Sequence, residues 1–193
     1  MISLPFRRPR QSPTIDALYG TIVAQARSPS FYLGYGVPDT VEGRLDMIVL
    51  HMVLLLRQLT KVSDNARGNV PPVGQELFDR FCQDIDDNFR EMGVGDLKVP
   101  KEMQRVAEEF YGRAKAYEGA LAGEGGEALE AAVARNVYGA NETPLGACRL
   151  AAYMREAVRR LGLQEAGAFA RGNIEFPDPE GVVPPGAEVR SRP

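Results

Sequence analysis

Histidine and cysteine are scarce in this chain, whose 193 residues include one histidine and two cysteines. Most zinc and haem sites need several histidine or cysteine ligands, and a histidine-activated nucleophile needs a well-placed imidazole. Two cysteines are also too few for a scaffold held together by disulfide bonds. The composition therefore argues against most metal sites, against histidine-dependent hydrolases and against a disulfide-rich fold.

Long apolar runs are absent as well. The longest covers residues 47–56, includes His51 and has a charged residue on each side. A membrane-spanning helix needs about 20 apolar residues, so this run predicts a buried helix. The pair Arg7-Arg8 is not followed by the apolar segment of a secretory signal. We therefore expect a cytoplasmic protein whose cysteines stay reduced.

The charge is slightly negative overall and unevenly distributed. A net charge of −3 argues against binding to DNA, because proteins that coat nucleic acid are normally basic. Residues 1–30 carry four arginines and one aspartate, whereas residues 61–100 carry five basic and eight acidic side chains. A basic arm suits a polyanionic partner such as a ribosome or membrane surface, and an acidic middle suits a basic partner.

Apolar residues recur at intervals of three and four along most of the chain, and no stretch shows the sustained alternation of a β-strand. Ser-Pro and Thr-Pro pairs mark several helix starts, and glycines mark several helix ends. The helix expected over residues 41–61 is apolar on nearly every side, which is typical of the centre of a bundle. Asp39 and Glu42 have the spacing of a capping box before it. We predict an all-α fold, a compact single-domain bundle of about seven to eight helices around this central helix.

Composition also sets the expected boundaries. We predict a flexible basic arm over residues 1–11, one helical domain over residues 12–171, and a disordered tail rich in Pro, Gly and charge over residues 172–193. Cys82 and Cys148 fall on apolar helix faces without the C-x-x-C spacing of redox and metal motifs, so we expect small buried side chains.

His51 lies in the most apolar of these helices. Because there is no second histidine, we expect His51 to be a core residue that makes polar contacts. An alternative is haem handling through a His–Met axial pair, since the chain has six methionines.

Residues 84–88 (DIDDN) form a dense group of carboxylates. They begin like a calcium-binding loop, but Phe89 and Gly95 stand where that loop requires glycine and glutamate. The D-x-D-D pattern resembles one that some terpene cyclases use for magnesium diphosphate. One alternative is therefore a small helical magnesium-dependent enzyme acting on an isoprenoid diphosphate. The simplest interpretation is a solvated acidic face, and a more specific one is a face that docks a basic partner. The absence of phosphate-loop and nucleophile motifs favours a binding or assembly role.

Four sequence blocks, taken in order, connect the chain to a known family. They are LYGxIVxQAR followed by FY (residues 18–32), GVPDTxEGRxD (36–46), FDxFCxDIDxNFREMGVGD (78–96), and VPKxM followed by FYGR (99–113). Together they resemble the ubiquinol–cytochrome c chaperone family over roughly residues 14–165.

The resemblance implies a helical assembly chaperone that is not an enzyme and needs no cofactor. It would bind newly made cytochrome b and assist biogenesis of the cytochrome bc1 complex (complex III). Further implied contacts are the ribosome near its tunnel exit, a small partner protein, and the inner face of the cytoplasmic membrane as a peripheral site. Holding an apolar client requires exposed apolar surface with a polar rim. The predicted protein-binding residues are Asp84, Asp86, Asp87, Arg90, Glu91, Gly93, Gly95 and Asp96.

Overall fold

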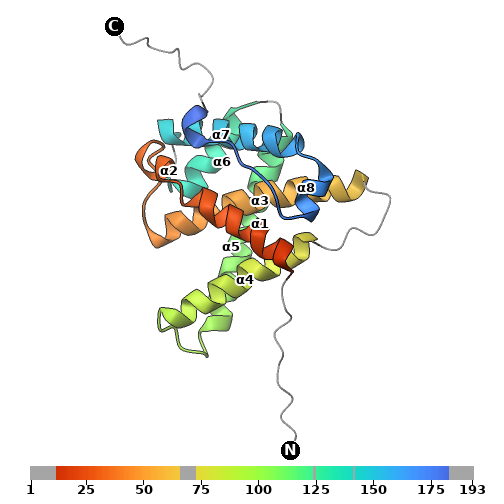
Figure 1. The fold of residues 1–193 in the computed structure, drawn as a ribbon. Helices are drawn as coiled ribbons and strands as arrows, with labels where there is room; N and C mark the ends of the chain where they lie inside the picture. The colour runs from red at the N-terminus through yellow and green to blue at the C-terminus, as the bar shows by residue number, and fades with distance from the viewer. Residues whose placement is uncertain (1–11, 66–72, 124, 141, 183–193) are drawn as a thin grey trace, which may run out of the picture.

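The computed structural model describes residues 12–65, 73–123, 125–140 and 142–182. Within these ranges every regular element is helical, which confirms the predicted all-α class (Figure 1). No helix within them is long and apolar enough to cross a membrane. The elements are α1 (Pro13–Ala26), α2 (Pro29–Leu33), α3 (Val41–Asn65), α4 (Val73–Glu91), α5 (Val99–Ala122), α6 (Glu127–Val137), α7 (Leu145–Gly162), α8 (Ala166–Ala170) and the 3-10 turn η1 (Pro179–Gly181).

The helix α3 is the centre of the bundle. Helices α1, α4, α5, α6 and α7 all pack against it (Figure 1). Residues 49–55 are each at most 1 % exposed, so two full turns have no solvent face. An apolar helix surrounded on all sides is the arrangement that its sequence predicts. The helix continues to Asn65, four residues beyond the predicted end.

The start of α3 differs in detail from the expected capping box. Thr40 provides the cap, because its Oγ1 accepts the backbone N–H of Gly43 at 3.0 Å. Asp39 instead pairs with Arg44, with 2.7 Å between Oδ1 and Nε. Glycine is required at position 43, since a Cβ there would stand 2.0 Å from the carbonyl oxygen of Pro38. The chain therefore enters the central helix through a close backbone contact.

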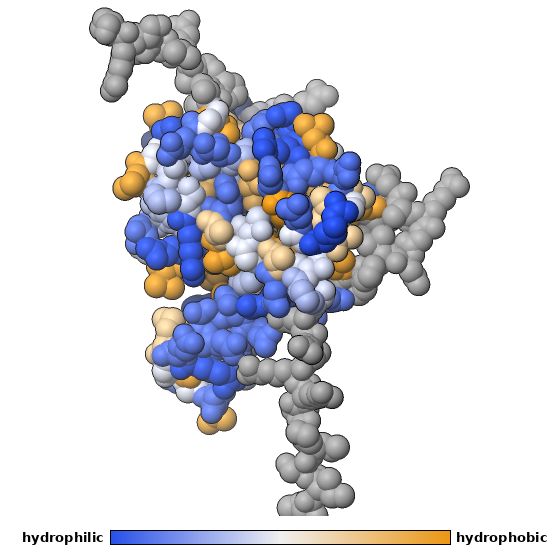
Figure 2. Space-filling view, in the orientation of Figure 1, coloured by the Kyte–Doolittle hydropathy of each residue, from blue (hydrophilic) through white to orange (hydrophobic). Residues whose placement is uncertain are grey.

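Helices α4 and α5 form a hairpin whose connecting end projects from the rest of the molecule, while their other ends pack against the body (Figure 1). Its inner part is fixed by aromatic rings: the Phe110 centroid lies 4.9 Å from that of Phe78 and 5.6 Å from that of Phe81. Phe81 is fully buried. In the space-filling view the projecting lobe is mostly hydrophilic, with a few hydrophobic atoms at its far end (Figure 2).

The segment from Gly172 to Val182 departs from the predicted disordered tail. It buries Ile174 and Phe176 against the core although it has no α-helix. Side chains satisfy its backbone: the Gln164 amide donates to the Glu175 carbonyl (2.6 Å) and accepts its N–H (3.0 Å). The composition of this segment predicted disorder, because hydrogen bonds from side chains to a backbone leave no periodic pattern in the sequence. Residues 183–193 and the predicted arm, 1–11, lie outside the described residues.

Candidate functional site

The turn between α4 and α5 contains most of the residues predicted to bind a partner. Gly93 has φ = +80°, a conformation that side chains strain, and its N–H donates to the Arg90 carbonyl at 3.0 Å. The Val94 N–H donates to the Phe89 carbonyl, also at 3.0 Å. These paired bonds are a Schellman ending, which reverses the chain sharply after α4. We call residues 86–98 the α4–α5 tip.

One arginine links the helix to this turn. The Arg90 Nε lies 2.7 Å from Asp86 Oδ2, one helical turn earlier, and its second nitrogen lies 2.5 Å from Asp96 Oδ1. Asp86, with a smaller contribution from Asp96, raises the pKa of the Arg90 guanidinium. The side chain stays charged and bridges two carboxylates. The bridge thus links the last turn of α4 to the loop that follows it.

Asp84 lies elsewhere, between α4 and α1. The Tyr19 hydroxyl donates to Asp84 at 3.0 Å, and Arg80 lies 3.5 Å from Asp84 and 3.1 Å from Asp16. Burial, reinforced by Asp84, raises the pKa of Tyr19 above its ordinary value, so the phenol remains a donor. These side chains line a groove of about 580 Å³ along α1. Asp84 therefore joins two helices and does not belong to the tip.

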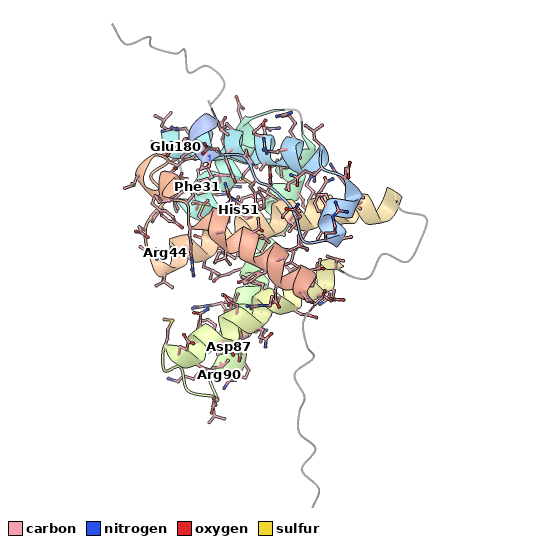
Figure 3. The ribbon with its side chains drawn as sticks, in the orientation of Figure 1. Phe31, Arg44, His51, Asp87, Arg90 and Glu180 are labelled. Carbon is pink, nitrogen blue, oxygen red and sulfur yellow. The ribbon has the colours of Figure 1, made fainter. Side chains whose placement is uncertain are left out.

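The remaining predicted residues all lie on the tip. Asp87 is half-buried on α4 near Arg90 (Figure 3), while Glu91, Gly93 and Gly95 are exposed. The predicted face is therefore split, because side chains two positions apart on a helix, such as Asp84 and Asp86, point to nearly opposite sides. The carboxylate-rich sequence alone did not distinguish these two surroundings.

This split also bears on the magnesium-diphosphate alternative. Such a site needs several carboxylates directed at one point. Asp84 is held by Tyr19 and Arg80, whereas Asp86 is held by Arg90. Across the described ranges no group of three His, Cys, Asp or Glu side chains is arranged to hold a metal ion. The D-x-D-D pattern does not form the required site.

Two apolar residues of the tip were missed by sequence reasoning. Leu97 is 98 % exposed and Met92 is 66 % exposed. The signal that could have found Leu97 is its position in a glycine-containing turn between Asp96 and Lys98, outside any helical stripe. A leucine there has no core to enter, and its exposure forgoes about 1.5–3 kcal/mol of burial.

His51 is a core residue with polar contacts, as its sequence position predicted. Its Nδ1 donates to the Met47 carbonyl (2.7 Å), and its Nε2 accepts from the Tyr153 hydroxyl (2.9 Å). The Gln25 amide donates to the same hydroxyl (3.0 Å) and to the Pro177 carbonyl (2.9 Å). Burial lowers the pKa of His51 to about 4, so the ring is neutral. Both ring nitrogens form hydrogen bonds inside the protein, so neither is free to bind a haem iron.

The two cysteines are free thiols that are half-buried, not buried as predicted. Cys82 packs against the core from its edge and does not lie inside it. Burial, with Asp79 nearby, raises the pKa of Cys82, and burial together with Glu130 raises that of Cys148. The Cys148 thiol donates to Glu130 Oε2 at 3.4 Å. Protonated thiols are poor nucleophiles, which fits a packing role.

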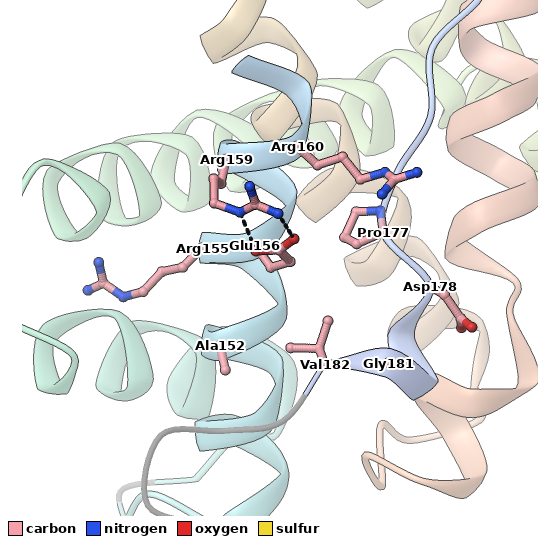
Figure 4. A pocket seen from close by; sticks show the side chains of 9 residues that line it. All are labelled: Ala152, Arg155, Glu156, Arg159, Arg160, Pro177, Asp178, Gly181 and Val182. Atoms are coloured by element: carbon pink, nitrogen blue, oxygen red, sulfur yellow. Dashed lines mark hydrogen bonds and ion pairs between the residues drawn. The ribbon is translucent and has the colours of Figure 1, made fainter. Parts of the chain in front are cut away.

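A cavity of about 540 Å³ lies between α7 and the segment before Val182 (Figure 4). Its basic side chains are engaged: Arg159 forms two bonds to Glu156 (2.6 and 2.7 Å), and Arg160 lies 3.1 Å from Glu175. Arg155 points away from the other labelled residues (Figure 4). The cavity is open and of mixed charge, without convergent groups for one ligand.

Comparison with known proteins identifies the family of this chain. Residues 34–176 match the family described as Ubiquinol-cytochrome C chaperone. The chain belongs to this family. The crystal structure of the Cbp3 homolog from Brucella abortus is similar to this chaperone, with a TM-score of 0.77 and 36% identity over 90% of this chain and 93% of that chain. No curated protein matches the sequence.

Membership makes the chain a chaperone connected with ubiquinol–cytochrome c reductase, complex III. The matched range extends from Gly34, just after α2, to Phe176 in the C-terminal segment. It therefore includes the α4–α5 tip of this ubiquinol–cytochrome c chaperone. It also includes the buried hydrogen-bonded group of Met47, His51 and Tyr153, which we call the His51 centre.

Proposed function

We propose that this chaperone binds newly made cytochrome b and assists the biogenesis of the cytochrome bc1 complex. The observation that carries the proposal is the family match over residues 34–176, together with a fold shared with the Cbp3 homolog over 90% of the chain. The chain acts in this proposal by binding, without catalysis or a cofactor.

The surface supports a role in holding an apolar client. Large apolar side chains between 60 % and 98 % exposed are found on several elements of the described chain. Single exposed residues are ordinary, but a chaperone for membrane segments needs some apolar contact points. The candidates among these side chains are Val41, Met92, Leu97, Tyr111, Leu145 and Leu163.

The proposal places this work in the cytoplasm, at the inner face of the cytoplasmic membrane, where the client is inserted. Ribosome contact near the tunnel exit and a small partner protein belong to the same proposal. The arginines of the arm, Arg7, Arg8 and Arg10, support contact with a phosphate-bearing surface, although they lie outside the described residues.

Affinity capture tests the proposal. The tagged chain is recovered from growing cells, beside a tagged unrelated helical protein, and cytochrome b is quantified in both samples. We expect enrichment of cytochrome b only with this chaperone, and lower haem b absorbance in membranes of a deletion strain. Equal cytochrome b in both captures, with unchanged haem b in the deletion strain, would refute it.

A further inference from the structure

The α4–α5 tip combines a constrained backbone with an apolar side chain in water. The Schellman bonds at Gly93 and the Arg90 bridge between Asp86 and Asp96 fix the turn. Leu97 follows Asp96 directly and is 98 % exposed. A partner that covers a side chain on such a backbone does not have to order the turn, so less conformational entropy is lost on binding. This is the arrangement expected of a binding anchor.

The charges around Leu97 restrict what the partner is. Residues 86–98 contain four acidic and two basic side chains, and the charge of Arg90 is already matched by two carboxylates. An acidic surface is repelled by anionic lipid headgroups and by the phosphates of RNA. It attracts a basic protein segment. The cytoplasmic ends of membrane helices are such segments, since they join an apolar stretch to flanking Lys and Arg.

The position of the tip fits the same partner. It lies at the end of the projecting hairpin, and the labelled Asp87 and Arg90 stand well apart from His51 and Phe31 in the body (Figure 3). Hydrophobic atoms at that end are surrounded by hydrophilic surface (Figure 2). A partner can therefore reach the tip without disturbing the core.

We propose that the α4–α5 tip docks the basic cytoplasmic end of a membrane segment of the client, with Leu97 as its apolar anchor and Asp87, Glu91 and Asp96 as its acidic rim. This inference rests on the proposed function, because it takes a membrane protein as the client. It names the surface used and the chemistry of the segment that the surface recognises.

The chain provides a matched control. Leu33 is 88 % exposed, but it borders two cavities lined by three arginines (Arg27, Arg44 and Arg149) and two carboxylates (Asp39 and Glu180). It is thus a similarly exposed leucine in surroundings without an excess of acidic groups. Leu33→Ser and Leu97→Ser make the same chemical change at two surfaces of different charge and add no charge of their own. Because both side chains are already in solvent, we expect both variants to melt at the wild-type temperature.

The first experiment measures peptide binding by fluorescence anisotropy with the purified full chain. The probes are a short fluorescein-labelled peptide with a leucine–alanine core and a lysine-rich end, and its counterpart with a glutamate-rich end. We expect the lysine peptide to bind more tightly, with affinity falling as salt rises. Leu97→Ser should weaken its binding about tenfold, and Leu33→Ser should leave it unchanged. Equal binding of both peptides, or an equal effect of both variants, would overturn the inference.

Other occupants of the tip have their own readouts. Binding of the wild-type chain to anionic phospholipid vesicles that is lost in Leu97→Ser would identify a membrane surface and overturn the inference. A wild-type dimer that Leu97→Ser converts to a monomer would do the same by identifying a second copy. We expect neither change.

Photo-crosslinking in cells separates this inference from the proposed function. A benzophenone amino acid at position 97 should cross-link to cytochrome b, and one at position 33 should not. Cross-links from position 33 alone would leave the proposed function standing and refute the tip as the docking surface. Absence of cytochrome b even from the wild-type capture described above would refute the proposed function itself.

Discussion

The His51 centre and the α4–α5 tip are both built from polar side chains, but they use opposite chemistry. In the body, His51 is fully buried and its hydrogen bonds join neutral groups. At the tip, Arg90 is exposed and its partners are charged. A buried charge is costly to desolvate, whereas an exposed ion pair costs little and contributes little. The fold is therefore stabilised in the body, and the tip can be specialised for contact.

The sharpest test of this contrast is Phe31→Ala. Phe31 is fully buried, with ring centroids 4.8 Å from Tyr153 and 5.5 Å from His51. Removing the ring should lower the free energy of unfolding by about 3–5 kcal/mol, measured by urea denaturation. Leu33→Ala, two residues away and 88 % exposed, should change it by less than about 0.5 kcal/mol. Similar losses in both variants would contradict the assignment of stability to the body.

A second prediction concerns pH and His51. Its folded pKa is lowered to about 4 by burial, below the ordinary 6.5, so the unfolded chain takes up a proton first. Stability from this group is complete above pH 6.5 and is lost as the pH falls toward about 4. The loss should reach up to about 3 kcal/mol relative to His51→Gln, which does not titrate.

The measurement is direct because the chain contains one histidine. Its imidazole resonances in an NMR titration should show no protonation in the folded protein until the pH approaches about 4. Protonation near the ordinary pKa with the fold intact would mean that the ring reaches solvent and that the body is less closed than we describe.

The third prediction concerns Asp46, which lies between the body and the hairpin. We expect its titration to change the stability less than that of His51 does, and in the opposite direction. Burial raises its pKa to about 6; Arg113, 2.7 Å away, opposes this rise, while Glu109 and Glu42 add to it. The folded state therefore binds the proton more readily than the unfolded chain. Stability relative to Asp46→Asn should increase as the pH falls through about 6, by on the order of 1–3 kcal/mol. A decrease over that interval would show that the Arg113 ion pair outweighs burial.

How much of this could be predicted from the sequence depends on the range of the interactions. The central position of α3 could be predicted because its sequence is apolar on nearly every side, and the end of α4 could be predicted from Gly93. The contact between Tyr19 and Asp84 could not be predicted, since it joins residues 65 positions apart on separate helices. The same holds for the C-terminal segment, which buries Phe176 through side-chain bonds without a repeating pattern.

The candidate site shows the same limit at shorter range. Helical spacing brings residues four positions apart to one side, and the structure joins Asp86 and Arg90 in this way. It could not show that Asp96 would complete the bridge from beyond the turn. Nor did it indicate Leu97, because an exposed anchor has no partner within the chain to create a pattern.

The smallest expected effect on stability comes from Arg90→Ala. Its ion pairs are exposed and screened by water, so the free energy of unfolding should equal that of the wild type within error. Local order should change instead: amide exchange at Gly93–Leu97 should become several-fold faster, because the turn loses its bridge to α4. Arg105→Ala removes exposed ion pairs within α5 and serves as the control, with no change in exchange at the tip. Unchanged exchange in Arg90→Ala would mean that the Schellman bonds at Gly93 hold the turn unaided, and Leu97 would remain fixed without the bridge.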